Sequence, residues 1–317
     1  MSSLTASSIR RRLTLTLSLA VAALSASLWT SPQAQACACG CAVFDVGTCT
    51  LLPSGEGGTV FVEWDFLNQH VNWSGTSSAP SDDNDDKKIR SNFYLLGGQY
   101  MFNSDWGVML ELPYTQRTVL STDAGPLEST SHSSIGDIRL MGVYSGFSPD
   151  MSTGLIFGVK LATGDSTFDG FDPDTEIGSG STDLLLGGYH TGKLTIDGTW
   201  QYFGQVLWQH EIATQHDYRP GSEINGAIGV AYNDWHIGKV GVSPLLQVLG
   251  SYRGHDGDLN GDADNTGYTR FLISPGIAFT FDNVKLYADA EIPFYQDMTG
   301  NQLSAPVAFK MILSYGF

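Results

Sequence analysis

Apolar and polar residues alternate along most of the chain. In the segment TVFVEWDF, every second residue from Val60 to Phe66 is apolar, and Glu63 and Asp65 lie between them. Successive side chains of an extended strand point to opposite faces, so a period of two predicts β-strands with one apolar and one polar side. The same pattern recurs in WGVMLELPY, RFLISPGIAFTF and VKLYADAEIPF. The chain is therefore predicted to be an all-β protein.

Twelve segments of this kind can be recognised, and the links between them alternate in length. The segments span residues 59–69, 89–102, 106–117, 135–147, 153–163, 181–190, 196–210, 223–232, 240–253, 268–281, 284–294 and 305–317. Long polar links such as SGTSSAPSDDNDDKK follow the odd segments, and short links such as NSD follow the even ones. This arrangement is typical of a transmembrane antiparallel up-and-down β-barrel. We predict such a barrel, with about 12 strands, over residues 58–317.

A soluble β-sandwich would show the same alternation, so other features must distinguish the two folds. Aromatic residues such as Trp106, Tyr114 and Phe281 gather at segment ends, where the two membrane interfaces would lie. The chain also ends in FKMILSYGF, in which alternate residues from Phe309 to Phe317 are apolar. A C-terminal aromatic on such a strand resembles the signal by which bacterial outer-membrane proteins are recognised for insertion. Both features favour a barrel in the outer membrane of a Gram-negative bacterium, in contact with its lipid and lipopolysaccharide.

The first 36 residues have the order of a secretory signal peptide. Three arginines at positions 10–12 precede an apolar run over 13–28, and Ala34-Gln35-Ala36 provides a small-x-small site just before Cys37. Removal of residues 1–36 takes away three of the 16 Lys and Arg residues, so the formal net charge changes from −17 to −20. A chain this acidic repels nucleic acid, which is therefore excluded as a partner.

If the apolar faces contact lipid, the opposite faces line the interior of the barrel. They carry ionisable side chains of both signs, and we expect the lumen to be lined by Glu63, Asp65, Arg90, Glu111, Asp137, Arg139, Lys160, Arg270, Lys285, Asp289, Glu291 and Lys310. Two interiors are compatible with this pattern: a closed one filled by neutralising pairs, and a narrow wetted pore for small solutes. We favour the pore, because so many charges would make a costly plug.

One of the long links resembles the start of a calcium-binding loop. DGDLNGDADNTG has the form D-x-D-x-N-G, with oxygen-bearing side chains at Asp256, Asp258, Asn260, Asp262 and Asp264. Its twelfth position is Gly267, where such loops have a bidentate glutamate. A solvated acidic loop is therefore the alternative to a calcium site.

Catalytic patterns have little support in this sequence. Ser131 and His132 are adjacent in a serine-rich link, but a barrel hydrolase needs a serine, a histidine and an orienting polar group at one place. We predict that the chain is not an enzyme.

The middle of the chain carries a further pattern in GDIRLMGVYSGF, GLIFGVKLATGD and GSGSTDLLLGGYHTG. The elements are Gly136-Asp137, Val159-Lys160-Leu161 with Thr163-Gly164-Asp165, and Gly178 to Ser181 with Asp183 and Gly187. Through them, residues 90–317 resemble a family of bacterial outer-membrane proteins labelled as components of the phenol-degradation meta pathway and often called transporters. The family usually has proline where this chain has Ala162. The resemblance implies a barrel that passes small, often aromatic or hydrophobic, compounds, and it implies no catalytic residues.

The segment 37–57 is not part of that resemblance, and it holds all four cysteines: Cys37, Cys39, Cys41 and Cys49. Two disulfides would suit the oxidising periplasm and would staple a short segment. The Cys-x-Cys-x-Cys spacing, however, strains a disulfide among the first three and suits a bound zinc or copper ion. Lipidation of Cys37 and free thiols are further alternatives.

The function of this segment therefore stays open at the level of sequence. It is either a periplasmic staple or plug of a channel, or a metal-binding or electron-transfer head that the barrel anchors. A closed structural barrel is the remaining alternative.

Overall fold

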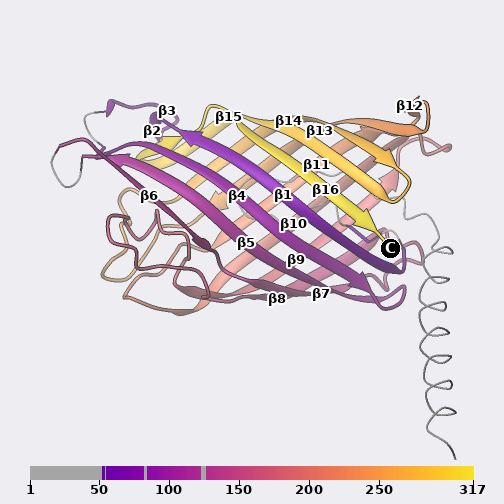
Figure 1. Ribbon diagram of the computed structural model, residues 1–317, viewed down its shortest axis with the longest axis horizontal. Helices are drawn as coiled ribbons and strands as arrows, with labels where there is room; N and C mark the ends of the chain where they lie inside the picture. Colours follow the sequence, from indigo (N-terminus) through magenta and orange to yellow (C-terminus); the bar gives the residue numbers. More distant parts are fainter. Residues whose placement is uncertain (1–51, 54, 82–83, 123–125) are drawn as a thin grey trace, which may run out of the picture.

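The computed structural model describes residues 52–53, 55–81, 84–122 and 126–317. In this part of the chain, twelve strands form one closed antiparallel barrel (Figure 1). The first strand, β1 (Gly57–Gln69), pairs with the last, β16 (Ala308–Gly316), and this pairing closes the sheet. No helix among the described residues is long and apolar enough to cross a membrane.

Each predicted segment corresponds to one barrel strand, so the prediction of a 12-strand up-and-down barrel is confirmed. The other ten barrel strands are β4 (Asp86–Met101), β5 (Trp106–Ser121), β7 (Arg139–Tyr144), β8 (Thr153–Lys160), β9 (Ser181–Lys193), β10 (Trp200–Thr214), β11 (Glu223–Tyr232), β13 (Val240–Arg253), β14 (Tyr268–Phe281) and β15 (Val284–Ser304). Four shorter strands belong to the links: β2 (Val71–Gly75), β3 (Ser77–Ser78), β6 (Glu128–Ile135) and β12 (Trp235–Ile237).

Several strand boundaries differ from the prediction, and two of these differences have identifiable reasons. The segment predicted over 135–147 is interrupted between β6 and β7, where Gly136 and Asp137 leave the strand. Strand β15 continues past residue 294 to Ser304, and its last part pairs with β2. This extension is mostly polar, and its few apolar residues do not alternate, so the hydrophobic pattern does not reveal it.

The outer face of the barrel carries a broad apolar band. Its exposed residues include Val62, Leu96, Leu110, Leu186, Ile228 and Leu313. Aromatic pairs flank the band: the ring centroids of Trp106 and Tyr144 lie 4.7 Å apart, and those of Tyr94 and Tyr114 lie 6.3 Å apart. An apolar band between aromatic girdles is the surface that a lipid bilayer covers.

The two ends of the barrel differ in their connections. Short turns, such as the one between Phe281 and Val284, lie at the same end as the C-terminus (Figure 1). The long links between β1 and β4, β8 and β9, and β13 and β14 emerge at the other end. Outer-membrane barrels place short turns in the periplasm and long loops outside the cell. We therefore name the two ends periplasmic and extracellular.

Candidate functional site

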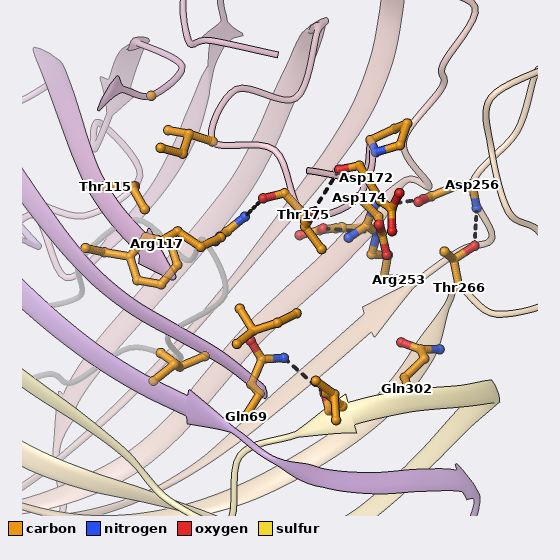
Figure 2. A pocket seen from close by; sticks show the side chains of 18 of the residues that line it. Gln69, Thr115, Arg117, Asp172, Asp174, Thr175, Arg253, Asp256, Thr266 and Gln302 are labelled. Carbon is orange, nitrogen blue, oxygen red and sulfur yellow. Dashed lines mark hydrogen bonds and ion pairs between the residues drawn. The ribbon is translucent and has the colours of Figure 1, made fainter. Parts of the chain in front are cut away.

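The barrel encloses a cavity of about 720 Å³, which we call the vestibule. It reaches from the long loops at the extracellular end down to Glu63, Glu111 and Lys310 in the middle of the barrel. Figure 2 shows the part of the vestibule near the extracellular loops, where side chains from strands and loops converge on the interior. The vestibule is the site at which a solute from outside would first meet the lumen.

The two walls of the vestibule differ in polarity. On β1, β4 and β5 the cavity is lined by an apolar patch, which we call the apolar wall, beside polar side chains of the same strands; the patch consists of Leu67, Ile89, Phe93, Leu95 and Pro113. The other wall is contributed by β11, β13 and the loops beside them, and its side chains are polar or charged; it includes Tyr218, Glu223, Arg253 and Asp256. A solute in the vestibule therefore meets an apolar surface on one side and a polar surface on the other.

The polar wall is organised around the buried carboxylate of Asp256. Arg253 Nη2 donates a hydrogen bond to Asp256 Oδ1 at 2.8 Å, and the Tyr218 hydroxyl donates to Oδ2 at 2.7 Å. The Gly221 amide donates to Oδ1 at 2.8 Å. Burial raises the pKa of Tyr218, so its hydroxyl keeps its proton and remains a donor. These bonds fix the loops around the vestibule mouth.

Charged side chains meet at the floor of the vestibule in what we call the charged ring: Glu63, Asp65, Glu111, Arg139, Lys160, Asp183 and Lys310. Lys310 Nζ donates to Glu63 Oε1 at 2.7 Å and lies 3.4 Å from Asp65 Oδ1. Lys160 Nζ lies 2.7 Å from Asp183 Oδ2, and Arg139 Nη1 lies 3.7 Å from Glu111 Oε2. All seven side chains are buried. Pairing at these distances is what allows ionised groups to remain inside the barrel.

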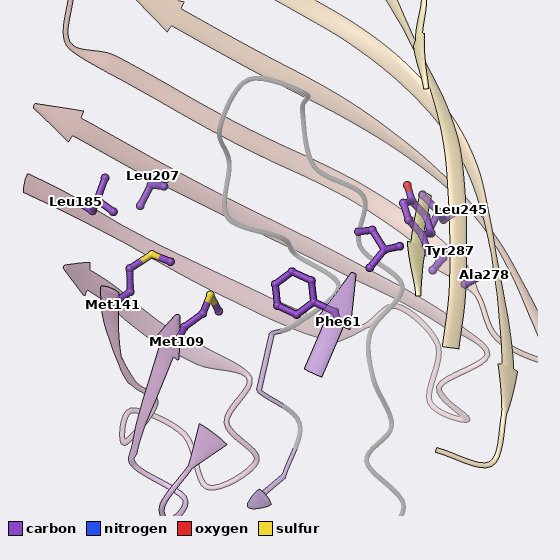
Figure 3. Packing of buried hydrophobic residues seen from close by; sticks show 10 residues of the cluster. Phe61, Met109, Met141, Leu185, Leu207, Leu245, Ala278 and Tyr287 are labelled. Carbon is purple, nitrogen blue, oxygen red and sulfur yellow. The ribbon is translucent and has the colours of Figure 1, made fainter. Parts of the chain in front are cut away.

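Apolar side chains form a second ring next to the charged one, on its periplasmic side. We call Phe61, Met109, Met141, Leu185 and Ile312 the apolar ring; they belong to a larger buried cluster that also contains Leu207, Leu245 and Tyr287 (Figure 3). Each member of the apolar ring lies two residues from a member of the charged ring on the same strand: Phe61 from Glu63, Met109 from Glu111, Met141 from Arg139, Leu185 from Asp183 and Ile312 from Lys310. Along the lumen from the vestibule towards the periplasmic end, the charged ring therefore comes first and the apolar ring next.

The structure places eleven of the twelve predicted lumen residues on the inner face, where all are buried: Glu63, Asp65, Glu111, Asp137, Arg139, Lys160, Arg270, Lys285, Asp289, Glu291 and Lys310. They do not act as one group. Asp289, for example, belongs to a separate network in which Gln247, Ser274 and Tyr287 donate hydrogen bonds to its Oδ2.

The prediction for Arg90 is wrong. Arg90 is exposed, and the inward positions of β4 are its odd-numbered residues, among them Ser91, Phe93 and Leu95. Both faces of this strand carry apolar residues: Phe93 and Leu95 face inward, and Tyr94 and Leu96 face outward. Alternation alone therefore could not show which face points into the lumen. The charge of Arg90 indicated the wrong face because this end of β4 extends towards the extracellular loops, where a charge can lie outside the barrel.

The five residues of the predicted calcium loop do not converge in this arrangement. The carboxylate of Asp256 accepts hydrogen bonds from Arg253 and Tyr218. Asp258 Oδ1 lies 3.5 Å from Arg219 Nη2. Asn260 donates to the carbonyl of His216, and Asp262 Oδ1 accepts the amides of Asp264 and Asn265. Within the described part of the chain, no group of three or more His, Cys, Asp or Glu residues is arranged to hold a metal ion. Calcium binding stays a prediction.

The signal peptide and the four cysteines lie outside the described residues. The boundaries at residues 36 and 57, the disulfides, the zinc or copper site and the lipidation of Cys37 therefore all stay predictions. Leu52, which is described, is buried against inward-facing residues of the barrel, among them Tyr189, Phe203 and Leu249. At this point the chain before β1 lies inside the barrel.

Ser131 and His132 do not form a catalytic pair. They are consecutive residues of β6, so their side chains point to opposite faces. Ser131 Oγ is hydrogen-bonded to Thr118 Oγ1 at 2.9 Å, and His132 Nε2 is hydrogen-bonded to Asp165 Oδ2 at 2.9 Å.

Sequence reasoning missed several residues of the site. The whole apolar ring was missed because its members were not assigned to the inner face. Asp183 and Arg117 were also missed, although both share the inward phase of neighbouring predicted residues. The signal that could have found them is parity: on each strand, residues two or four positions from an inward charge share its face.

No protein-family model matches the sequence, and no curated protein matches it. Many solved structures are similar in fold, among them two bacterial outer-membrane barrels. The crystal structure of an outer-membrane channel from Pseudomonas putida F1 has a TM-score of 0.62 at 14% identity, over 86% of this chain and 100% of that one. The β domain of the Bordetella autotransporter BrkA has a TM-score of 0.51 at 13% identity, over 83% of this chain and 100% of that one.

These similarities show the fold, and they agree with the apolar outer band and the alternating loop lengths. The phenol meta-pathway label that the sequence suggested stays a prediction. The chain has the fold of an outer-membrane β-barrel, with a vestibule, a charged ring and an apolar ring in its interior.

Proposed function

We propose that this barrel is an outer-membrane channel for small hydrophobic solutes, including aromatic ones, and that its role is not enzymatic. The observation that carries the proposal is the apolar wall of the vestibule, formed by Leu67, Ile89, Phe93, Leu95 and Pro113, with an apolar ring further along the same lumen. The similar fold of a Pseudomonas putida outer-membrane channel supports it.

The apolar wall favours this class of solute for a physical reason. Burial of apolar surface contributes about 25 cal/mol per Å², so a small aromatic molecule gains free energy when it leaves water for this wall. Only one side of the vestibule is apolar, and a solute bound on one side keeps part of its surface in water. Binding is then favourable enough for entry and weak enough for release, as conduction requires.

The charged ring adds a second selection. Its ion pairs contain more carboxylates than cations: Lys310 lies between Glu63 and Asp65, and Arg139 faces Glu111. A carboxylate solute that entered this ring would have to compete with the ring's own carboxylates for their cation partners. We therefore expect neutral hydrophobic solutes to pass more easily than carboxylates of the same size.

Uptake by cells that express the full chain tests the proposal. The variant is Leu95→Asn, which makes the apolar wall polar. Its control is Leu259→Asn, the same substitution at a loop residue that is 88% exposed. The measurement is the uptake rate of radiolabelled toluene and of a sugar of similar size, in a Gram-negative strain that lacks its own channels for aromatic compounds.

The wild type and L259N are expected to accelerate toluene uptake, and L95N is expected to lose part of that acceleration while sugar uptake stays low. A wild-type barrel that reaches the outer membrane folded, yet leaves toluene uptake at background, would contradict the proposal. Equal acceleration of toluene and sugar would identify a general porin instead.

A further inference from the structure

The loop between β8 and β9, residues 161–180, is fastened at both ends by one buried carboxylate. Asp137 Oδ1 accepts hydrogen bonds from the amides of Thr163, at 3.1 Å, and Gly164, at 2.9 Å. Asp137 Oδ2 accepts hydrogen bonds from the amide of Ser179, at 2.8 Å, and from its hydroxyl, at 2.6 Å. Charge-assisted bonds of this length are the stronger kind, and here four of them converge on a single side chain.

The two ends of the loop also pack directly on each other. A Cβ atom on Gly178 would lie 2.4 Å from the carbonyl carbon of Gly164, so only glycine permits this approach. The Gly178 amide donates to the carbonyl of Asp165 at 2.7 Å. Lys160, at the end of β8, donates to the Ser179 hydroxyl at 2.7 Å and lies 3.8 Å from Asp137. We call these two contacting segments, residues 163–165 and 178–179, the neck of the loop. Lys160 links the neck to the charged ring.

The tip of the loop lies in the vestibule. Asp172, Asp174, Thr175 and Ile177 line the cavity, and Figure 2 shows Thr175 beside Arg117 of β5. The Arg117 guanidinium donates to the carbonyls of Thr175 and Glu176, the second at 2.9 Å. Arg117 is itself held by Ser91 and lies over the ring of Phe93, on the apolar wall. This contact joins the loop tip to β5, two strands along the wall from β8.

A third attachment lies between neck and tip. His132 of β6 is hydrogen-bonded to Asp165 at 2.9 Å, and its ring stacks on Phe168 with the centroids 3.9 Å apart. A polar loop of this length would gain conformational entropy by extending into water. Attachment at three places instead holds it inward across the vestibule.

We propose that Asp137 is the anchor that keeps the β8–β9 loop folded into the vestibule, and that the loop sets the largest solute the channel admits. The inference rests on the proposed channel function and assigns its size limit to one loop and one positioning residue. It also explains a sequence pattern, because Gly136-Asp137, Thr163-Gly164-Asp165 and Gly178-Ser179 are separate in the chain and meet at this neck.

The test compares Asp137→Ala with Asp197→Ala in the full chain. Asp197 also accepts a backbone hydrogen bond, from the Thr199 amide at 3.1 Å, but it lies in a periplasmic turn. The measurements are single-channel conductance in planar bilayers and the size limit for entry of a series of polyethylene glycols. D137A is expected to show a higher conductance and a larger size limit, and D197A is expected to match the wild type.

Two further variants separate anchoring from general stability. Asp137→Asn keeps one acceptor oxygen and can hold only one end of the loop, so its size limit should lie between those of wild type and D137A. A merely structural role would lower the stability of the barrel without this graded shift. If D137A fails to fold, removal of residues 168–174 with the neck intact is expected to enlarge the size limit in the same way.

The outcomes distinguish this inference from the function on which it rests. A folded wild-type barrel with no conductance and no solute uptake would overturn the channel function itself. A conducting wild type whose size limit is unchanged in D137A, or in the shortened loop where D137A does not fold, would overturn the anchor alone. Hydrogen exchange over residues 165–178 gives an independent readout, and it should accelerate in D137A and not in D197A.

Discussion

Every member of the apolar ring lies two residues from a member of the charged ring on the same strand, yet different interactions hold the two rings in place. Each cation of the charged ring has a specific partner: Lys310 has Glu63, and Lys160 has Asp183. The apolar ring has no such pairs and packs by shape, as where the Phe61 ring lies over Gly97. The difference shows that one barrel interior can contain two kinds of packing. The charged ring loses stability when one member of an ion pair is removed, and the apolar ring loses stability when the volume of its side chains changes.

The largest effect is expected from removing a cation of the charged ring. Lys310→Met leaves Glu63 and Asp65 buried beside each other without their shared partner. Loss of one member of a buried ion pair costs about 3–5 kcal/mol. The free energy of unfolding, measured by urea denaturation in lipid vesicles, should fall by this amount. Lys193→Met, at an exposed lysine of β9, is the control. Equal stability of K310M and K193M would show that the ring does not depend on pairing.

A smaller effect is expected from adding volume to the apolar ring. In Gly97→Ala the new Cβ would lie 2.0 Å from the tip of the Phe61 ring, which must swing into the lumen. Overpacking of this kind costs about 1–3 kcal/mol. G97A should therefore lose stability and conduct less than the wild type.

The adjacent glycine provides the control for this change. A Cβ on Gly98 would meet its nearest atoms at 3.8 Å, so Gly98→Ala should leave both the unfolding free energy and the conductance unchanged. Adding Phe61→Leu to G97A should restore the conductance. If G97A and G98A behave alike, the Phe61 ring does not need the space above Gly97.

A third effect is local and depends on pH. Burial raises the pKa of Glu176, in the β8–β9 loop, to about 7 from an ordinary value of 4.5. A carboxyl with a raised pKa binds more protons in the folded loop than in the unfolded chain, so the loop loses stability as pH rises from 4.5 to about 7.

Hydrogen exchange over residues 165–178, corrected for the intrinsic rates, measures this effect. Protection should be greater at about pH 5 than at about pH 8 in the wild type. The fall in protection between these pH values should be smaller in Glu176→Gln, whose side chain does not titrate. A wild-type loop with the same protection at both pH values would show that Glu176 does not control it.

The smallest effect is expected outside both rings. Changing Cys37, Cys39, Cys41 and Cys49 together to serine should leave the unfolding free energy of the barrel and its conductance unchanged, because neither ring contains a cysteine. We expect the protein extracted without reductant to have two disulfides and a mass lower by four hydrogens, with no metal. About one zinc or copper per chain, lost in the serine variant, would support a metal-binding head instead.

The sequence by itself determined the strands and, for most of them, the face that points inward. Alternation is a local property, since neighbouring side chains of any strand must point to opposite sides. Glu63 and Glu111 could therefore be assigned to the lumen without knowledge of the fold. The assignment failed at Arg90 because β4 is apolar on both faces, so its local pattern has no unique phase.

Only the tertiary structure decided which inward residues meet. Lys310 and Glu63 are 247 positions apart, and the pairing of the first and last strands brings them to 2.7 Å. Asp137 holds Thr163 and Ser179 because the loop between two strands returns to the same point of the wall. Contacts of this kind depend on strand register and loop path. No local pattern specifies them, because they form only when the whole sheet closes.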